Sequence, residues 1–174
     1  MPTREQFEQR LAAGYSIRAD LLGRIAPGYD AVLAAIANLS EASLLAAPDG
    51  GWSIRDHLHH LASWERKVVA QALRDPIPPA LGISAAAWAK GNGDAINEAV
   101  AVNGQGLSGA EAVRALQDAH AVTVATIAAL PETEFLRPGY PDERDSAMLL
   151  SYFVGNTNGH YAEHLPQIEA LLAL

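Results

Sequence analysis

Glycines, prolines and capping residues divide this chain of 174 residues into stretches in which apolar side chains recur every three or four positions. That spacing puts the apolar side chains on one face of a helix, whereas half-buried strands need strict alternation, which this chain lacks. Four of the predicted helices are long, and a long crossing connection separates the second of these from the third, so we expect an all-α protein built as a four-helix bundle. The predicted helices cover residues 5–13, 16–39, 54–73, 94–102, 109–130 and 146–172.

Local signals place two helix starts and one interruption. Ser53 precedes the second long helix and Asp56 occupies its third position, which predicts a reciprocal capping box with Asp in place of Glu. Ser108 is predicted to cap the third long helix. Pro27 cannot donate a hydrogen bond to the carbonyl of Gly23, so a kink or break is expected in the first long helix.

Composition excludes several classes of partner. The net charge is -8 and the 12 Lys and Arg residues are scattered, whereas a nucleic-acid binder needs a basic stripe. No apolar run approaches the roughly 18 residues of a membrane span, and the polar N-terminus lacks a signal-peptide core. The chain has no cysteine, hence no disulfide and no thiol nucleophile of its own. We therefore expect one cytoplasmic domain over residues 1–174 that binds neither nucleic acid nor membrane.

Histidines offer a candidate metal site. His160 and His164 are four positions apart, so on a helix both imidazoles share one face and can bind one metal ion; a solvated polar face is the alternative explanation. A third ligand is available in the cluster His57, His59 and His60. His57 and His60 share one stripe of the helix wheel, so the wheel does not choose between them. His59 lies off both apolar stripes and is expected to be exposed.

Two segments carry a resemblance to a known family. The sequence WSIRDHLHHLASWE begins at Trp52, and GNTNGHYAEHLPQI begins at Gly155. Together they resemble the DinB/YfiT-like superfamily, a group of helical proteins described as metalloenzymes. The resemblance implies a four-helix bundle of up-down-down-up order with a long connection between helices 2 and 3, often assembled as a homodimer. It also implies a divalent metal ion, usually zinc or nickel.

The resemblance also implies a ligand set. In that family one His of the second bundle helix and two His spaced four apart on the last helix hold the metal. Counted from Trp-Ser, the first ligand falls on His60, which is followed by Leu-Ala, and the others fall on His160 and His164. The His-rich run departs from the family pattern and leaves His57 as a substitute ligand; a second departure is the proline in the first long helix.

Such a site suggests a reaction class. Three neutral imidazoles leave an open position on a metal for water or substrate, as in catalytic rather than structural zinc sites. Some members of the family are thiol-dependent S-transferases and others are hydrolases. The prediction is a metal-dependent hydrolase or thiol-dependent S-transferase acting on a small molecule, with any low-molecular-weight thiol supplied by the substrate. Glu163 is the candidate for proton transfer.

Further residues are expected around this site. Candidate pocket walls are Asn156, Trp64, Trp88 and Tyr161, whereas His120, alone on its helix, is expected to be structural or to line the pocket without binding metal. Specificity is expected to come from residues 74–93, a connection too long for a simple loop, and from residues 135–145.

Two other functions compete with this one. The first is a non-catalytic or vestigial bundle that binds or sequesters a small ligand, since a fold does not dictate a function. The second is an inverted zinc peptidase, because His160, Glu163 and His164 also spell His-x-x-Glu-His. Peptidases of that kind need a further ligand well downstream, which makes this second alternative the weaker one.

Overall fold

The computed structural model describes residues 2–140 and 146–173, and in these ranges the regular elements are helices, with one isolated bridge between Pro138 and Met148. The prediction of an all-α protein is confirmed. None of the helices in these ranges is long and apolar enough to cross a membrane. The elements are α1 (Arg4–Ala12), α2 (Ile17–Ile36), α3 (Glu41–Leu45), α4 (Ile54–Leu73), α5 (Ile77–Leu81), α6 (Ala85–Trp88), α7 (Gly93–Gly104), α8 (Gly109–Ala129), the 3₁₀ helix η1 (Glu132–Leu136), α9 (Leu149–Asn156) and α10 (Asn158–Leu171).

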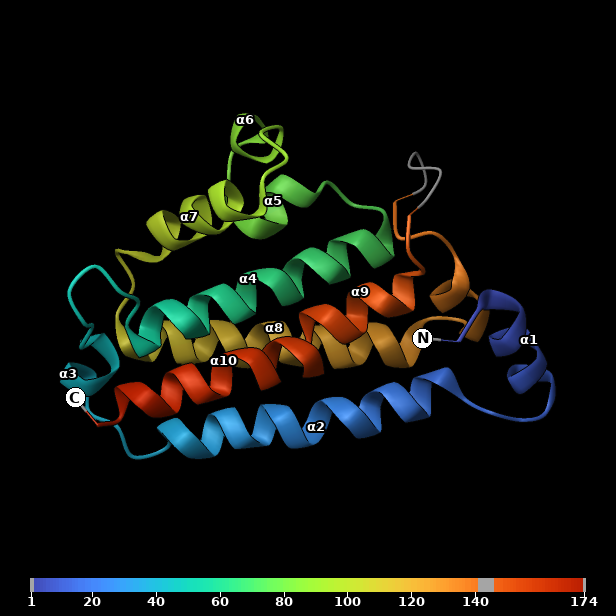
Figure 1. Cartoon of the computed structure of the whole chain (residues 1–174), viewed down its shortest axis with the longest axis horizontal. Helices are drawn as coiled ribbons and strands as arrows, with labels where there is room; N and C mark the ends of the chain where they lie inside the picture. The colour runs from blue at the N-terminus through green and yellow to red at the C-terminus, as the bar shows by residue number, and fades with distance from the viewer. Residues whose placement is uncertain (1, 141–145, 174) are drawn as a thin grey trace.

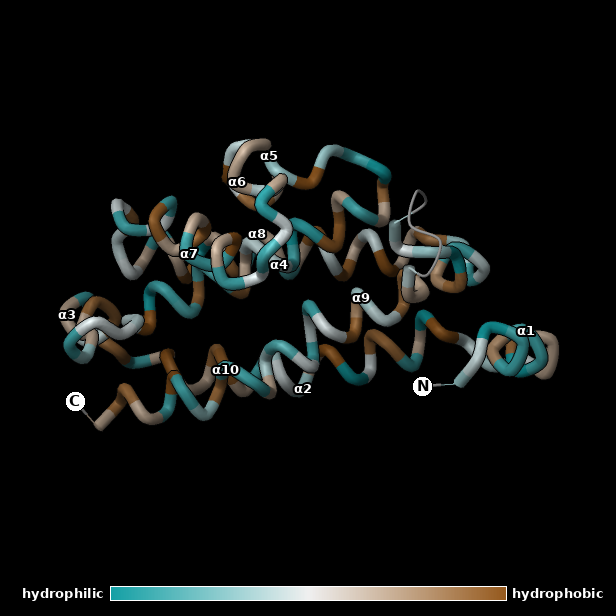
Figure 2. Tube along the Cα trace, turned by 45° about the horizontal axis from the view of Figure 1, so that its top comes forward, coloured by the Kyte–Doolittle hydropathy of each residue, from teal (hydrophilic) through white to brown (hydrophobic). Residues whose placement is uncertain are grey.

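The long helices form the body of the molecule. Figure 1 shows α2, α4, α8 and the consecutive pair α9–α10 side by side along its long axis. α4 packs most extensively against α8, and α10 packs against α2 and α4. Their inward faces bury one apolar core, in which Tyr161, Phe135 and Phe153 are the largest fully buried side chains. Along α2 and α10, hydrophobic and hydrophilic residues alternate as each helix turns (Figure 2), as expected for helices with one buried face.

The connection between α4 and α8 is itself helical. α5 and α7 pack on α4, and together with α6 they form a layer outside the long helices (Figure 1). They bury a small second core of Leu81, Ile96 and Val100. The prediction that residues 74–93 are more than a simple loop is confirmed, and α7 is brought across the outer face of α4.

Capping begins the long helices where the sequence predicts. The Ser53 backbone N–H donates to Asp56 Oδ2 at 2.9 Å, and Ser53 Oγ accepts from the Asp56 N–H. Ser108 and Glu111 form the equivalent box at α8. A contribution from outside the helix was not predicted: the Glu41 carboxylate of α3 accepts from the Gly109 N–H at 2.6 Å. Negative charge is favourable there because a helix N-terminus exposes unpaired N–H groups.

The expected interruption at Pro27 does not break the helix. α2 continues as one helix of 20 residues through Pro27. Both Pro27 and Gly23, whose carbonyl loses its helical partner, are exposed. Water can therefore satisfy that carbonyl, and the missing hydrogen bond costs less than it would in the core.

The last predicted helix is wrong in one respect, because residues 146–172 do not form a single helix. α9 and α10 meet at Thr157, whose backbone is non-helical at φ -126° and ψ -104°. The Asn156 side-chain amide donates to the Tyr152 carbonyl and the Thr157 hydroxyl to the Phe153 carbonyl, both at 2.6 Å. Side chains that donate to a carbonyl four residues back bend helices. The break puts His160 in the first turn of α10.

One test of this fold concerns the end of α4. Arg74 adopts a left-handed conformation, φ 64°, which costs any residue with a Cβ about 1–2 kcal/mol and suits glycine. Its side chain makes one exposed ion pair, 3.8 Å from Glu134, of the kind that contributes little. Arg74→Gly should therefore raise the free energy of unfolding by up to about 1 kcal/mol in urea titrations, after the entropic cost of glycine. Arg74→Ala keeps the Cβ and should bring no gain; equal values for the two variants would contradict this account.

Candidate metal centre

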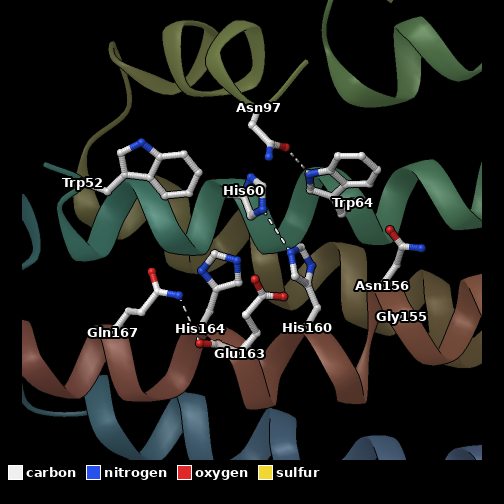
Figure 3. A pocket seen from close by; sticks show the side chains of 10 residues that line it. All are labelled: Trp52, His60, Trp64, Asn97, Gly155, Asn156, His160, Glu163, His164 and Gln167. Atoms are coloured by element: carbon white, nitrogen blue, oxygen red, sulfur yellow. Dashed lines mark hydrogen bonds between the residues drawn. The ribbon is translucent and has the colours of Figure 1, made fainter. Parts of the chain in front are cut away.

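Three imidazoles converge between α4 and α10. His60 comes from α4, and His160 and His164 come from successive turns of α10. His60 Nε2 lies 3.0 Å from His160 Nε2, and one ring nitrogen from each of the three lies within 4.8 Å of the others. Figure 3 shows the His60 side chain reaching down from α4 toward the two histidines of α10. The sequence spacing and the helix break together produce this convergence.

The donor set fits a metal ion. All three side chains are buried, and burial, reinforced by the neighbouring imidazoles, lowers the pKa of His60 to about 2 and that of His160 to about 3. Burial also lowers the pKa of His164. The rings are therefore neutral at pH 7, which is the state that binds a metal. His60 Nδ1 and His160 Nδ1 have no hydrogen-bond partner among the described residues, so these rings carry unused donor or acceptor capacity.

His57 lies behind this cluster. Its Nδ1 is 2.9 Å from His164 Nδ1, and its ring meets the Trp52 indole edge-on. If the proton between the two rings is on His164 Nδ1, His164 donates to His57 and keeps its Nε2 lone pair free. A ligand histidine commonly donates its second N–H to a neighbour in this way. The helix wheel leaves the choice between His57 and His60 open; in the structure His60 contacts His160, and His57 contacts His164.

His59 corrects an expectation. It was predicted to be exposed but is only 4% exposed, because α7 covers that side of α4. A Cβ on Gly104 of α7 would lie 2.5 Å from His59 Cδ2, so glycine at position 104 makes the close contact possible. The pattern within α4 carries no information about this outer layer.

A second polar cluster lies inside the core. Glu65 is fully buried and its carboxylate accepts a hydrogen bond from the Tyr161 hydroxyl. His120 Nδ1 is 3.0 Å from that hydroxyl and 3.7 Å from Glu65 Oε2, and the His120 ring stacks on Tyr29. His120 is thus a core residue away from the histidine triad, in line with the structural role predicted for it.

A cavity of about 450 Å³ opens over the triad, and we call it the histidine pocket. Besides the three imidazoles, its side chains are those of Trp52, Trp64, Asn97, Asn156, Glu163 and Gln167.

The residues predicted to line the histidine pocket do so only in part. Trp64 and Asn156 line the histidine pocket as expected, and Glu163, the candidate for proton transfer, lines it as well. Tyr161 was predicted as a wall but points into the core toward Glu65, and Trp88 was predicted as a wall but packs on the outer core under α5–α7.

The predicted source of specificity is also wrong for the residues the structure describes. The described parts of 74–93 and 135–145 do not line the pocket, and residues 141–145 of the second range lie outside the described residues. The walls that sequence reasoning missed are Trp52, Gln167 and Asn97 of α7, whose Oδ1 accepts from Trp64 Nε1 at 3.2 Å. No motif marks Asn97, because its place depends on how α7 lies across α4.

Comparison with known proteins gives one match. A family model described as the DinB superfamily matches residues 26–168, a range that includes both histidine-bearing segments. No curated protein and no solved structure matches the chain.

Proposed function

Because this chain belongs to the DinB superfamily, we propose that it is a metalloenzyme in which His60, His160 and His164 hold one divalent metal ion. The convergence of three buried, neutral imidazole nitrogens within 4.8 Å carries the proposal. Imidazole suits several first-row metals, and the resemblance favours zinc or nickel among them. With three protein ligands, a fourth position is left for water or substrate.

Each residue that lines the pocket has a distinct role in the proposed reaction. A bound ion acts there as a Lewis acid toward water, a carbonyl or a thiolate. Glu163, exposed on α10 beside the two histidines, is proposed to take up or return the proton of the reacting group. Trp52 and Trp64 flank His60 and orient the bound molecule, and Asn97 fixes the Trp64 indole through its N–H. The buried face of the pocket excludes bulk water.

The proposed reaction is hydrolysis of a small molecule or transfer to a thiol. The chain contains no cysteine, so a transferred thiol would be the second substrate. A pocket of about 450 Å³ has the size of small-molecule sites. A bundle that only holds a ligand is the alternative, and the metal measurement below separates the two.

The proposal also covers the order of the helices, the oligomeric state and the cellular location. We assign α2, α4, α8 and α9–α10 to a four-helix bundle of up-down-down-up order, which the directions of their ribbons in Figure 1 support. A single domain over residues 1–174, a homodimer and a cytoplasmic location are part of the same proposal.

The test is the metal content of tag-free protein by elemental mass spectrometry after incubation with zinc or nickel. The expected result is about one equivalent per chain, lost in His60→Ala and His160→Ala. His57→Ala should keep its metal with an affinity lowered by about 10–100-fold, the usual effect of removing a partner behind a ligand.

His59→Ala is the matched control, because it removes a buried imidazole of the same helix that lies outside the triad. Full metal content in His60→Ala would show that the ligand set is wrong. No uptake of either metal by the parent protein would favour the ligand-holding bundle instead.

A further inference from the structure

The walls of the histidine pocket carry little charge. None of the described residues lining it is Lys or Arg, and Glu163 is its one carboxylate. The remaining polar walls are the side-chain amides of Asn97, Asn156 and Gln167. Phosphates and carboxylates are normally held by Arg forks or Lys ammonium groups, which these walls do not provide.

The basic side chains of α4 nearest the pocket are turned to other partners. Arg55 donates to the Gln105 carbonyl and pairs with Asp56. Arg66 donates to the Ala80 carbonyl under α5. Lys67 is buried, with its ammonium group bonded to Gln71 at 3.0 Å, 4.7 Å from the centre of the Tyr152 ring and 5.7 Å from the centre of the Trp64 ring. None of these three residues lines the pocket, although Lys67 lies against the Trp64 indole, so Trp52 offers the indole face that the Lys67 ammonium does not contact.

The remaining surfaces suit a different kind of molecule. Trp52 and Trp64 stand on either side of His60, and Glu163 lies on the facing helix (Figure 3). Indole faces attract cations as well as apolar groups, and a nearby carboxylate adds to the attraction. Amide side chains donate and accept, so they bind uncharged hydroxyl and carbonyl groups.

We propose that the histidine pocket selects a small molecule whose part away from the metal is uncharged or cationic, and that it disfavours phosphate or carboxylate groups on that part. This inference rests on the proposed function and narrows its substrate class. It disfavours polycarboxylate thiols as second substrates and favours neutral or amine-bearing ones. Glu163 sets the discrimination, in addition to any part in proton transfer.

We call this selection by charge the charge rule. A matched series of probes tests it in zinc-loaded protein. Three benzohydroxamates carry the same metal-binding head and a para trimethylammonium, tert-butyl or carboxylate group. Dissociation constants are read from Trp fluorescence, since Trp52 and Trp64 line the pocket. The carboxylate probe should bind about tenfold or more weakly than the tert-butyl probe, and the trimethylammonium probe at least as tightly. Equal or tighter binding of the carboxylate probe would overturn the proposal.

Variants of α10 locate the source of the selection. Glu163→Gln should bring the three dissociation constants closer together, and Glu163→Lys should make the carboxylate probe the tightest. Glu169→Gln is the matched control, because it makes the same charge change at an exposed position of α10 that does not line the pocket. An unchanged ratio in Glu163→Lys would contradict the role given to Glu163.

Failure of the charge rule can be told apart from failure of the metal site. Metal content is measured first and independently of the probes. If the protein takes up no metal, the proposed function fails, and the rule is then tested in metal-free protein with benzyltrimethylammonium and phenylacetate, which lack the hydroxamate. Tighter binding of the cation would still support the charge rule, and tighter binding of phenylacetate would overturn it.

Discussion

Tyr161→Phe is expected to lower the free energy of unfolding by about 2–4 kcal/mol, far more than loss of a surface hydroxyl. The hydroxyl it removes donates to Glu65, and both side chains are fully buried. Glu65 Oε2 accepts no hydrogen bond from the described residues and lies 3.7 Å from His120 Nδ1, so the variant would leave a buried carboxyl group with no described hydrogen bond. Leaving a buried polar group without its hydrogen bond costs about 1–3 kcal/mol, and more when the group is charged, because its lost hydration is not replaced. Urea titration of metal-free protein at pH 7 measures the change.

Two further variants separate the hydrogen bond from the packing. Tyr29→Phe removes a half-buried phenol hydroxyl next to the same cluster but leaves the Tyr161–Glu65 bond intact, so its effect should be under about 1 kcal/mol. The double variant Tyr161→Phe with Glu65→Leu removes both partners and should be more stable than the sum of the single changes predicts. Additive losses in this cycle would contradict the proposed coupling.

Acid is expected to unfold the metal-free protein because its buried histidines must take up protons. Burial lowers the pKa of His57 to about 4 in the folded protein, and His60 and His160 are lowered further. In the unfolded chain each titrates near 6.5. The unfolded state therefore binds more protons below pH 6.5, and stability that is fully present above this pH is lost as the pH falls toward the folded values. Each such histidine contributes a slope of about 1.4 kcal/mol per pH unit.

The loss should be large on the scale of the whole protein. Two of these histidines alone would remove about 4 kcal/mol between pH 6.5 and 5, against a typical total of roughly 5–15 kcal/mol. Urea titrations at pH 7.5, 6.5, 5.5 and 5.0 give the slope of the free energy of unfolding against pH. His60→Leu removes one titrating group and should reduce this slope by about 1.4 kcal/mol per pH unit. A free energy of unfolding that stays constant from pH 7.5 to 5 would show that the cluster is not held neutral.

The parts of the fold that the sequence predicted well depend on local chemistry. The starts of α4 and α8 follow from Ser53 and Ser108, whose side chains bond to backbone groups three residues on. The pairing of His160 with His164 likewise follows from the turn of one helix. Such signals lie within a few residues of each other, so a single sequence contains them in full.

The parts that were missed depend on contacts between distant segments. The run Gly155-Asn156-Thr157-Asn158-Gly159 is rich in residues that favour turns, but the predicted helix runs through it, and the break is stabilised by side chains that bond to their own helix. His59 is buried by α7, and Tyr161 faces Glu65, a residue 96 positions away along the chain. A helix wheel records which residues share a face but not what covers that face.

In the candidate metal site too, local sequence predicted some features, and contacts between distant segments decide the others. Spacing and resemblance together named His60, His160 and His164, and the structure brings all three together. The wheel alone left His57 as an equal choice, because its ring lies on the same stripe of α4. The antiparallel register sets His60 opposite His160 and His57 opposite His164, and His60 joins both histidines of α10 in the cluster within 4.8 Å; that His60 is the ligand stays a prediction.

The break at Thr157 has a consequence for how this protein can change over evolutionary time. In an uninterrupted helix, one inserted residue rotates everything beyond it by about 100°, which would turn His160 and His164 out of the site. Here the first hydrogen bond of α10 runs from the Tyr161 N–H to the Thr157 carbonyl, so α10 starts its own count of turns. Insertions and deletions in α9 can be absorbed at the joint. We expect the segment before Thr157 to tolerate length variation that the segment after it would not.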